Sequence, residues 1–290
     1  MSRINKAIEL LAQGQPVYIT GTRELTYANG LRMARTFADI VRLELEHEPF
    51  DMRALGEFMR GIVAGGPTAS GHRTPCVVVE LPTDGSDEAT VRANAWQVKH
   101  VLAQGVHGVM LCHAETPGAV RAFVEAARYS FQKIGMGEQL GQGRRGHGGQ
   151  ATAAPLWGLS ETEYLHKADA WPLNPEGELL IGLKIENQRA LANVEQTLAV
   201  PGVAFAEWGP GDMGMSLGMP EAHDPPYKPV MAAARQRVIA AIRANQRYLF
   251  ELVTPDDLIA KLDDGQMICG TNNAELAARG REHTKRARPW

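Results

Sequence analysis

The sequence contains little of what marks membrane, secreted or nucleic-acid-binding proteins. Its three cysteines, Cys76, Cys112 and Cys269, lie far apart and form no CxxC pair, so no disulfide framework is evident and a reducing cytosol is expected. The first twenty residues carry Lys6 and Glu9 and contain no long apolar run, which argues against a signal peptide or a transmembrane helix. The formal net charge of -3 offers no basic footprint for nucleic acid. We therefore expect a cytoplasmic protein that binds neither membrane nor nucleic acid.

What the chain does contain is a regular alternation of short apolar segments and helical patterns. We expect strands at 16–20, 38–45, 75–81, 106–112, 178–186, 202–208 and 265–271, and helices at 51–66, 87–105, 116–129, 187–200 and 228–246. Apolar strands alternating with helices are typical of parallel strands covered by helices. Seven or eight such units favour a single-domain (β/α)8 TIM barrel over residues 1–290. An open doubly wound sheet is the alternative. No GxGxxG follows the first strand, and no organic cofactor is expected.

The segment 130–177 interrupts this alternation. It includes the glycine-rich stretch GMGEQLGQGRRGHGGQ, residues 135–150. A long loop inside a compact domain is usually either functional or disordered, so a lid and a mobile surface insertion are both open. The stretch lacks the Gly-Lys-Ser/Thr ending of a phosphate-binding Walker motif. Phosphate binding is therefore not expected there.

Acidic residues and histidines gather where the expected strands end. They are Glu44, Glu46, His47 and Glu48 after the second strand, Glu80 and Asp84 after the third, His113 and Glu115 after the fourth, Lys184 and Glu186 after the strand at 178–186, and Glu207 and Asp212 after the next. In a parallel barrel the chemistry lies at the carboxyl ends of the strands. Such groups are costly to bury without partners, and a cation would reconcile several carboxylates. Oxygen ligands favour Mg²⁺ or Mn²⁺.

Each of these residues also has an ordinary structural interpretation. Glu186 is equally at home as an acid at the start of a helix, where the helix dipole favours it. Asp212 suits a turn in which it bonds its own backbone, and a lone histidine such as His47 is usually structural. Glu44 and Glu46 alternate with leucines, so both could face solvent on a half-buried strand.

Three segments, taken in order, resemble the HpcH/HpaI aldolase family: LELEHEPFD at 43–51, LKIEN at 183–187 and WGPGDMGMSLG at 208–218. The most specific is a Gly-Pro-x-Asp turn followed by a serine, 26 residues after the Ile-Glu strand end. The resemblance extends from about residue 16 to residue 271. Family members are metal-dependent class II aldolases of 2-oxo acids, related to citrate lyase β subunits and macrophomate synthase. The resemblance implies a (β/α)8 barrel whose last helix is exchanged between subunits of a trimer or hexamer.

The resemblance also implies roles for individual residues. Glu186 and Asp212 would bind Mg²⁺ or Mn²⁺, with Co²⁺ as a further option. His47 would be the catalytic base, and Glu44 the acid that pairs with it. The backbone amides of Gly211 and Asp212 would hold the substrate carboxylate. The metal would stabilise the enolate formed when the carbon–carbon bond breaks, while His47 removes the proton of the 4-hydroxyl group.

Two positions depart from the family pattern. An arginine that clamps the oxo acid normally ends the third strand, but Glu80 or Leu81 occupies that place here, and such a change inverts the charge. Lys184 stands where a glutamine is usual. We predict that Lys184 either pairs with Glu80 or supplies the missing positive charge. Further candidates for that charge lie in the glycine-rich segment: Arg144, Arg145 and His147, with Arg145 the one expected to bind substrate.

The sequence therefore predicts a divalent-metal-dependent lyase that interconverts a 4-hydroxy-2-oxo acid with pyruvate, or a related oxo acid, and an aldehyde. Trp157, Trp171 and Tyr164 could wall a site for an aromatic or bulky aldehyde, although packing of the insertion onto the barrel is the favoured interpretation. The alternatives are oxaloacetate decarboxylase or acyl-CoA lyase chemistry on the same barrel, a non-catalytic binding protein, and a Schiff-base aldolase using Lys184.

Overall fold

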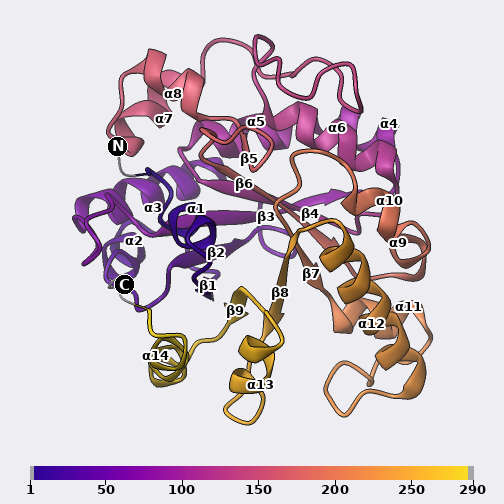
Figure 1. The fold of residues 1–290 in the computed structure, drawn as a ribbon. Coiled ribbons are helices and arrows are strands. Elements are labelled where there is room, and N and C mark those ends of the chain that lie inside the picture. The colour runs from indigo at the N-terminus through magenta and orange to yellow at the C-terminus, as the bar shows by residue number, and fades with distance from the viewer. Residues whose placement is uncertain (1–2, 287–290) are drawn as a thin grey trace.

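The computed structural model describes residues 3–286 and has eight parallel strands in a closed ring, surrounded by helices (Figure 1). The strands are β1 (Val17–Thr22), β2 (Ile40–Glu44), β3 (Cys76–Asp84), β4 (Gly108–Cys112), β6 (Leu179–Ile185), β7 (Phe205–Trp208), β8 (Tyr248–Leu252) and β9 (Ile268–Gly270). They pair in the order β4-β3-β2-β1-β9-β8-β7-β6, and the pairing of β4 with β6 closes the ring. The predicted (β/α)8 barrel is confirmed.

Except for α1, which precedes β1, and α14, which follows β9, the helices lie between strands, and most of them begin at a side chain that caps them. They are α1 (Lys6–Ala12), α2 (Tyr27–Met33), α3 (Met52–Ala64), α4 (Glu88–Ala93), α5 (Ala95–Ala103), α6 (Pro117–Ala127), α7 (Gln150–Trp157), α8 (Glu161–Lys167), α9 (Gln188–Ala192), α10 (Val194–Leu198), α11 (Pro210–Ser216), α12 (Pro229–Ala244), α13 (Leu258–Asp263) and α14 (Ala274–His283). Asp51 and Thr116, for example, accept hydrogen bonds from the first turns of α3 and α6. No helix within residues 3–286 is both long and apolar enough to cross a membrane.

The strands bury apolar side chains on both faces, as parallel barrel strands do. On β2 and just beyond it, Leu43 and Leu45 are fully buried in the core between the strands and the helices. The part of the barrel interior near the amino-terminal ends of the strands is also apolar, and α1 packs against it with residues such as Ile8 and Leu11. This packing closes the amino-terminal end of the barrel, so that polar side chains collect at the other end.

The structure corrects several predicted elements. The helix expected at 87–105 is divided at Asn94, and the one at 187–200 is divided at Asn193. Strand β8 was not predicted. It follows α12 after only three residues, without a glycine or proline to mark the break, because Gln246 adopts the positive φ of 55° that the turn needs.

The insertion at 130–177 joins the end of α6 to the start of β6 and therefore lies at the amino-terminal end of the barrel. It contains α7, α8 and the short strand β5 (Ala170–Trp171), which pairs with the first residues of β6. Trp157 stacks on His107 and donates a hydrogen bond to the carbonyl of Gly105, both just before β4. Tyr164 is fully buried against Trp157. Trp157 and Tyr164 therefore pack the insertion onto the barrel, in agreement with the favoured interpretation. At this end of the barrel they form neither a lid nor a wall for an aldehyde at the carboxyl ends of the strands.

The last helix, α14, packs on β1 of the same chain. The guanidinium of Arg281 lies 4.7 Å from the centroid of the Tyr18 ring. Arg286 makes two hydrogen bonds of 2.6 Å to the carboxylate of Asp39, which Lys6 also approaches at 3.1 Å. This buried ionic cluster ties the two ends of the chain to the start of β2. Exchange of this helix between subunits stays a prediction.

Candidate active site

Four potential metal ligands converge at the carboxyl ends of the strands. They are Glu46, His113, Glu186 and Asp212, and one ligand atom from each lies within 4.8 Å of the others. They follow β2, β4, β6 and β7, as expected for parallel strands that deliver side chains to one end of a barrel. The structure thus brings together Glu186 and Asp212, the two carboxylates selected from the sequence. It adds Glu46 and His113, which lay at predicted strand ends without an assigned role.

Glu186 is fixed by its neighbours at the end of β6. The backbone N–H of His113 donates a hydrogen bond of 2.8 Å to its Oε1, and its side chain is almost fully buried. A Cβ on Gly209 would lie 2.6 Å from the Cβ of Glu186, closer than real Cβ contacts. Gly209 is therefore required to make room for Glu186, rather than for a ligand to approach the backbone. Burial raises the pKa of Glu186 above its usual range.

Asp212 lies in the first turn of α11, where the sequence predicted only a turn. β7 ends at Trp208, as predicted, and the helix begins two residues later with Pro210. The first N–H groups of a helix have no partner within it, which leaves those of Gly211 and Asp212 directed out of the helix end. No side chain caps this end.

Glu46, which was named from the sequence only as a strand-end acid that could face solvent, is one of the four converging side chains. Its Oε1 is buried and has no hydrogen-bond partner within residues 3–286. Burial alone would raise its pKa, but the ammonium of Lys184 outweighs that effect and lowers it. An unpaired, ionised carboxylate oxygen aimed into a cluster of ligands is what a cation site requires.

His113 adopts a strained backbone conformation, with φ at 46°. This conformation is uncommon for residues other than glycine and is a recurrent feature of functional sites. Its Nε2 lies 3.8 Å from Oε1 of Glu46, and its Nδ1 lies 3.2 Å from the amide nitrogen of Asn187. Asn187 also bonds Glu115 at 2.9 Å. The asparagine of the LKIEN segment therefore orients the histidine.

Lys184 lies inside the cluster rather than beside it. Its Nζ is 2.5 Å from Oε2 of Glu46 and 3.1 Å from Oε2 of Glu186. Burial works to lower its pKa, but Cys112 and the carboxylates of Glu186, Glu207 and Glu80 raise it above the usual value. The predicted pairing of Lys184 with Glu80 is wrong, because the ammonium contacts the two ligand carboxylates instead.

Glu80 pairs with Arg42. The guanidinium Nη1 of Arg42 lies 3.0 Å from Oε1 of Glu80 and 3.5 Å from Oε1 of Glu207. Burial raises the pKa of Glu80, and it raises that of Glu207 to about 8. Leu81 is buried in the outer core. Glu80 is thus the residue that faces the barrel interior, and Arg42 stands next to the place of the missing arginine.

His47 and Glu44 lie at the rim of the site but do not pair as expected. Oε1 of Glu44 accepts hydrogen bonds from the backbone N–H groups of Glu46 and His47, at 2.7 and 3.0 Å. The His47 side chain is 61% exposed, and its Nε2 lies 3.7 Å from Oε2 of Glu46. Glu44 therefore shapes the turn after β2, while Glu46 is the carboxylate nearest the imidazole.

Arg145 does not reach the site. It is buried 4.1 Å from the centroid of the Tyr129 ring and donates a hydrogen bond to the hydroxyl of Tyr164. It also contacts the carbonyl of Ala127, the last residue of α6. Because α6 runs away from the carboxyl end of β4, this is the opposite end of the barrel. Its predicted role in substrate binding is wrong, and the same location in the insertion removes Arg144 and His147.

The donor set fits a divalent cation. Glu46, Glu186 and Asp212 bring three carboxyl groups and Lys184 one ammonium, so the fully ionised cluster would carry two negative charges. Carboxylate oxygens suit Mg²⁺ or Mn²⁺, whereas the imidazole of His113 is a ligand more typical of transition metals. The unpaired oxygen of Glu46 supports the same conclusion.

Comparison with known protein families and sequences agrees with this geometry. The model of the family described as HpcH/HpaI aldolase/citrate lyase matches residues 78–268. A hydroxypyruvate/pyruvate aldolase of Paraburkholderia phytofirmans is 28% identical over 213 residues, which cover 73% of this chain and 70% of that protein. A 2-keto-3-deoxy-L-rhamnonate aldolase of Klebsiella pneumoniae is 29% identical over 155 residues, 53% of this chain and 51% of the relative. The chain thus spans only about half of the second relative.

Solved structures share the whole barrel. An HpcH/HpaI aldolase/citrate lyase family protein from Burkholderia cenocepacia has a TM-score of 0.70 at 22% identity, covering 97% of this chain and 98% of that one. The citrate lyase beta subunit of M. tuberculosis, complexed with oxaloacetate and magnesium, has a TM-score of 0.54 at 14% identity, covering 92% and 96%. At these identities the likeness concerns the fold.

Proposed function

The chain belongs to the HpcH/HpaI aldolase/citrate lyase family, and from this we propose that it is a divalent-metal-dependent aldolase acting on a 4-hydroxy-2-oxo acid. Its products are pyruvate, or a related 2-oxo acid, and an aldehyde, and the reverse reaction joins them. The observation that carries the proposal is the convergence of Glu46, His113, Glu186 and Asp212 around one point. The names of two relatives, both aldolases, support the reaction class.

The four converging side chains would hold Mg²⁺ or Mn²⁺, with Co²⁺ as a further option. When bound, the cation supplies positive charge that stabilises the enolate of the oxo acid. The N–H groups of Gly211 and Asp212 lie at the open end of α11 and would receive the carboxylate of the substrate. Glu46 and Glu186, held by their bonds to the protein, need not reorganise during the reaction, which is what electrostatic stabilisation requires.

His47 is our proposed base. In the cleavage direction it removes the proton of the 4-hydroxyl group, the bond between C3 and C4 breaks, and the electron pair moves into the oxo acid as its enolate. The aldehyde leaves, and a proton added at C3 completes pyruvate. The exposed ring of His47 is open to a substrate, and Glu46 at 3.7 Å would stabilise its protonated form. His113 is wedged among the ligands and is the less accessible of the two.

Lys184 is our proposed replacement for the family's strand-three arginine. Its ammonium is the positive charge nearest the ligand carboxylates, whereas Glu80 is occupied by Arg42. Placed there, it would attract the carboxylate and the oxo group of a 2-oxo acid. We further propose that the protein is cytoplasmic and works as a trimer or hexamer.

Metal removal and a single substitution test the proposal. Cleavage of a 4-hydroxy-2-oxo acid should stop after treatment with EDTA and return with Mn²⁺, and Asp212→Asn should lower kcat/KM at least a hundredfold. Asp256→Asn, which changes an exposed carboxylate before α13, is the matched control. Oxaloacetate should be assayed in parallel, because decarboxylation without aldol cleavage would assign the sister activity. Unchanged turnover in Asp212→Asn would rule out the proposed site.

A further inference from the structure

The side-chain amide of Asn187 is held in one orientation by its neighbours. Its Oδ1 accepts a hydrogen bond of 2.8 Å from the backbone N–H of Ala190, in the first turn of α9. Its Nδ2 therefore faces the other way, where it lies 2.9 Å from Oε1 of Glu115 and 3.2 Å from Nδ1 of His113. Turning the amide over would set its oxygen against the Glu115 carboxylate and its NH2 group against the N–H of Ala190. Only the first orientation satisfies both neighbours.

This orientation determines which ring nitrogen of His113 carries the hydrogen. An amide NH2 group only donates hydrogen bonds, so Nδ1 of His113 accepts one with its lone pair. A neutral imidazole carries one N–H, which must then be on Nε2. Neither ring nitrogen has a lone pair left for a cation. Histidines that bind metals show the opposite arrangement, in which the second nitrogen donates to a carboxylate or a carbonyl.

The Nε2–H group of His113 has no hydrogen-bond partner within residues 3–286. Oε1 of Glu46 at 3.8 Å and Oδ1 of Asp84 at 3.9 Å are both too far to accept from it. The ring nevertheless lies inside the cluster, since its Nδ1 is 3.7 Å from Oε1 of Glu186. The side chain is 27% exposed. A small molecule bound at the cluster can therefore reach this N–H group.

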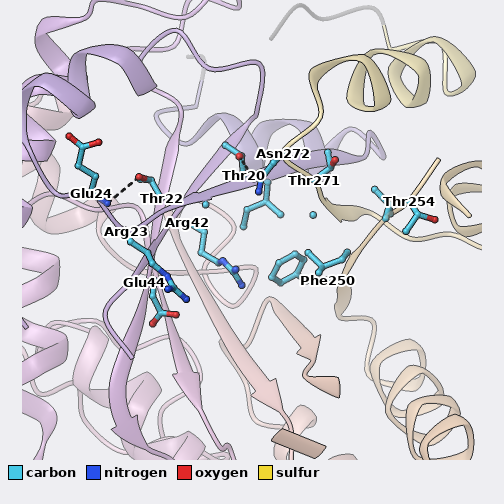
Figure 2. A pocket seen from close by; sticks show the side chains of 15 residues that line it. Thr20, Thr22, Arg23, Glu24, Arg42, Glu44, Phe250, Thr254, Thr271 and Asn272 are labelled. Carbon is cyan, nitrogen blue, oxygen red and sulfur yellow. Dashed lines mark hydrogen bonds between the residues drawn. The ribbon is translucent and has the colours of Figure 1, made fainter. Parts of the chain in front are cut away.

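Lys184 and Arg42 also bring N–H groups to this end of the barrel, but both are directed elsewhere. The ammonium of Lys184 is held by two of the ligand carboxylates. The guanidinium of Arg42 contacts Glu80 and lies over the ring of Phe250, on the wall of a cavity of about 720 Å³ between β1, β2, β8 and β9 (Figure 2). Of these three side chains, only His113 has an unpaired N–H group inside the cluster.

We propose that His113 is a catalytic hydrogen-bond donor and not a metal ligand, and that its Nε2–H group binds the 2-oxo oxygen of the substrate. The proposal rests on the function proposed above and narrows the ligands to the carboxylates of Glu46, Glu186 and Asp212. As the carbon–carbon bond breaks, negative charge develops on the 2-oxo oxygen, and an N–H group already in place stabilises it. Asn187 is the positioning residue, because it keeps the ring in the Nε2–H form.

NMR of the metal-free protein, labelled with ¹⁵N-histidine at about pH 8, tests the tautomer without turnover. Correlation of ring protons with ring nitrogens distinguishes the Nε2–H form from the Nδ1–H form, and the signals of His113 are those missing from His113→Asn. We expect the Nε2–H form. The double variant Asn187→Asp with Glu115→Gln keeps an acceptor for Ala190 and turns a second acceptor toward Nδ1, so it should convert the ring to the Nδ1–H form. An Nδ1–H form in the wild type, or an unchanged ring in the double variant, overturns the proposal.

Two substitutions of His113 separate a donor from a ligand. Asparagine tolerates the positive φ and ends near the position of Nδ1, so His113→Asn loses the Nε2–H group. His113→Gln reaches the position of Nε2 with an amide N–H. Calorimetric titration should give both variants an Mn²⁺ affinity close to that of the wild type, whereas Asp212→Asn should bind Mn²⁺ at least about tenfold more weakly. Binding in His113→Asn as weak as in Asp212→Asn would make His113 a ligand and overturn the proposal.

Exchange of the pyruvate methyl protons with deuterium, followed by NMR at saturating Mn²⁺, reports enolate formation without an aldehyde. His113→Asn should slow the exchange about a hundredfold, and His113→Gln should recover most of the loss. Unchanged exchange with slower aldol cleavage would place the donor at the aldehyde oxygen and contradict the assignment. A wild type without exchange or cleavage would count against the proposed function alone, because the tautomer and the Mn²⁺ titrations still decide whether His113 is a ligand. Equal thermal midpoints of the variants control for folding.

Discussion

Replacement of Lys184 by glutamine should strengthen metal binding while it weakens catalysis. The ammonium of Lys184 contacts two of the carboxylates that would hold the cation, at 2.5 and 3.1 Å. It therefore neutralises part of the charge that attracts a divalent metal. Glutamine is neutral and of similar length, so Lys184→Gln removes the competing charge with little loss of volume.

The size of the effect follows from Coulomb's law. The ammonium lies 2.5 and 3.1 Å from two ligand carboxylates, and a cation bonded to those carboxylates at about 2 Å would lie about 5 Å from it. Charges of +1 and +2 at that distance repel by about 1.7 kcal/mol in water-like surroundings and by about 7 kcal/mol at the effective dielectric constant of a protein site. The smaller value alone corresponds to about 15-fold in Kd. Lys184→Gln should therefore bind Mn²⁺ at least about 15-fold more tightly than the wild type.

Calorimetric titration with Mn²⁺ at pH 7.5 measures the affinity, and the aldol assay at saturating Mn²⁺ measures kcat. Lys167→Gln, which removes the ammonium of an exposed pair with Glu176, is the matched control and should change neither. Lys184→Gln with unchanged or weaker Mn²⁺ binding would refute the reasoning about charge. Tighter binding with undiminished kcat would leave the metal argument intact and remove the proposed role of Lys184 toward the oxo acid.

Two further predictions concern packing and acid stability. Gly209→Ala should weaken Mn²⁺ binding at least tenfold, because the new methyl group would displace Glu186. Gly211→Ala is the control, since nothing lies within 4 Å of its Cβ position, and an unchanged Kd in Gly209→Ala would contradict the packing argument. Burial alone would raise the pKa of Asp39, but Arg286, Lys6 and Arg281 lower it from 3.8 to about 2. The ionised carboxylate therefore contributes about 2 kcal/mol to the free energy of unfolding. This contribution is fully present above about pH 4 and is lost as the pH falls through about 2. Urea unfolding at pH 7 and at pH 3 should show Asp39→Asn to be less stable at pH 7 and less sensitive to acid, and equal midpoints at pH 7 would refute a stabilising cluster.

The barrel could be predicted from local signals, whereas Glu186 and Asp212 were chosen among the strand-end acids by the resemblance to the family. Apolar strands alternate visibly with capped helices, and an acid after a buried strand must lie at the carboxyl end of a parallel sheet. Glu186 and Asp212 therefore converge as expected. The packing role of Gly209 was not predicted: it leaves room for the side chain of Glu186.

The remainder of the site depends on which strands become neighbours and how far each side chain reaches. Alternation along β2 places Arg42, Glu44 and Glu46 on one face, but it does not say which of them meets Glu186 across the ring. Glu80 was the partner suggested for Lys184 by the sequence, and only the closed barrel shows that Lys184 contacts Glu46 while Glu80 contacts Arg42. Arg145 was wrongly assigned to the substrate site because no pattern in the sequence shows that the insertion lies at the amino-terminal end of the barrel.

Near the carboxyl ends of the strands, one half of the barrel interior is lined by charged side chains such as Arg42 and Glu80, and the other half is left open by glycines. Neither arrangement is what the stability of the fold alone would favour. Buried ion pairs such as Arg42 with Glu80 are often no more stable than apolar residues of the same size. Glycines at Gly21 and Gly270 leave space where branched side chains would pack. A chain under selection for folding alone would fill both halves with valine and leucine, as this one does near the amino-terminal ends of the strands, around α1. The charged half and the open half meet at Arg42 and Glu44, so both departures lie at the end of the barrel that carries the proposed metal ligands.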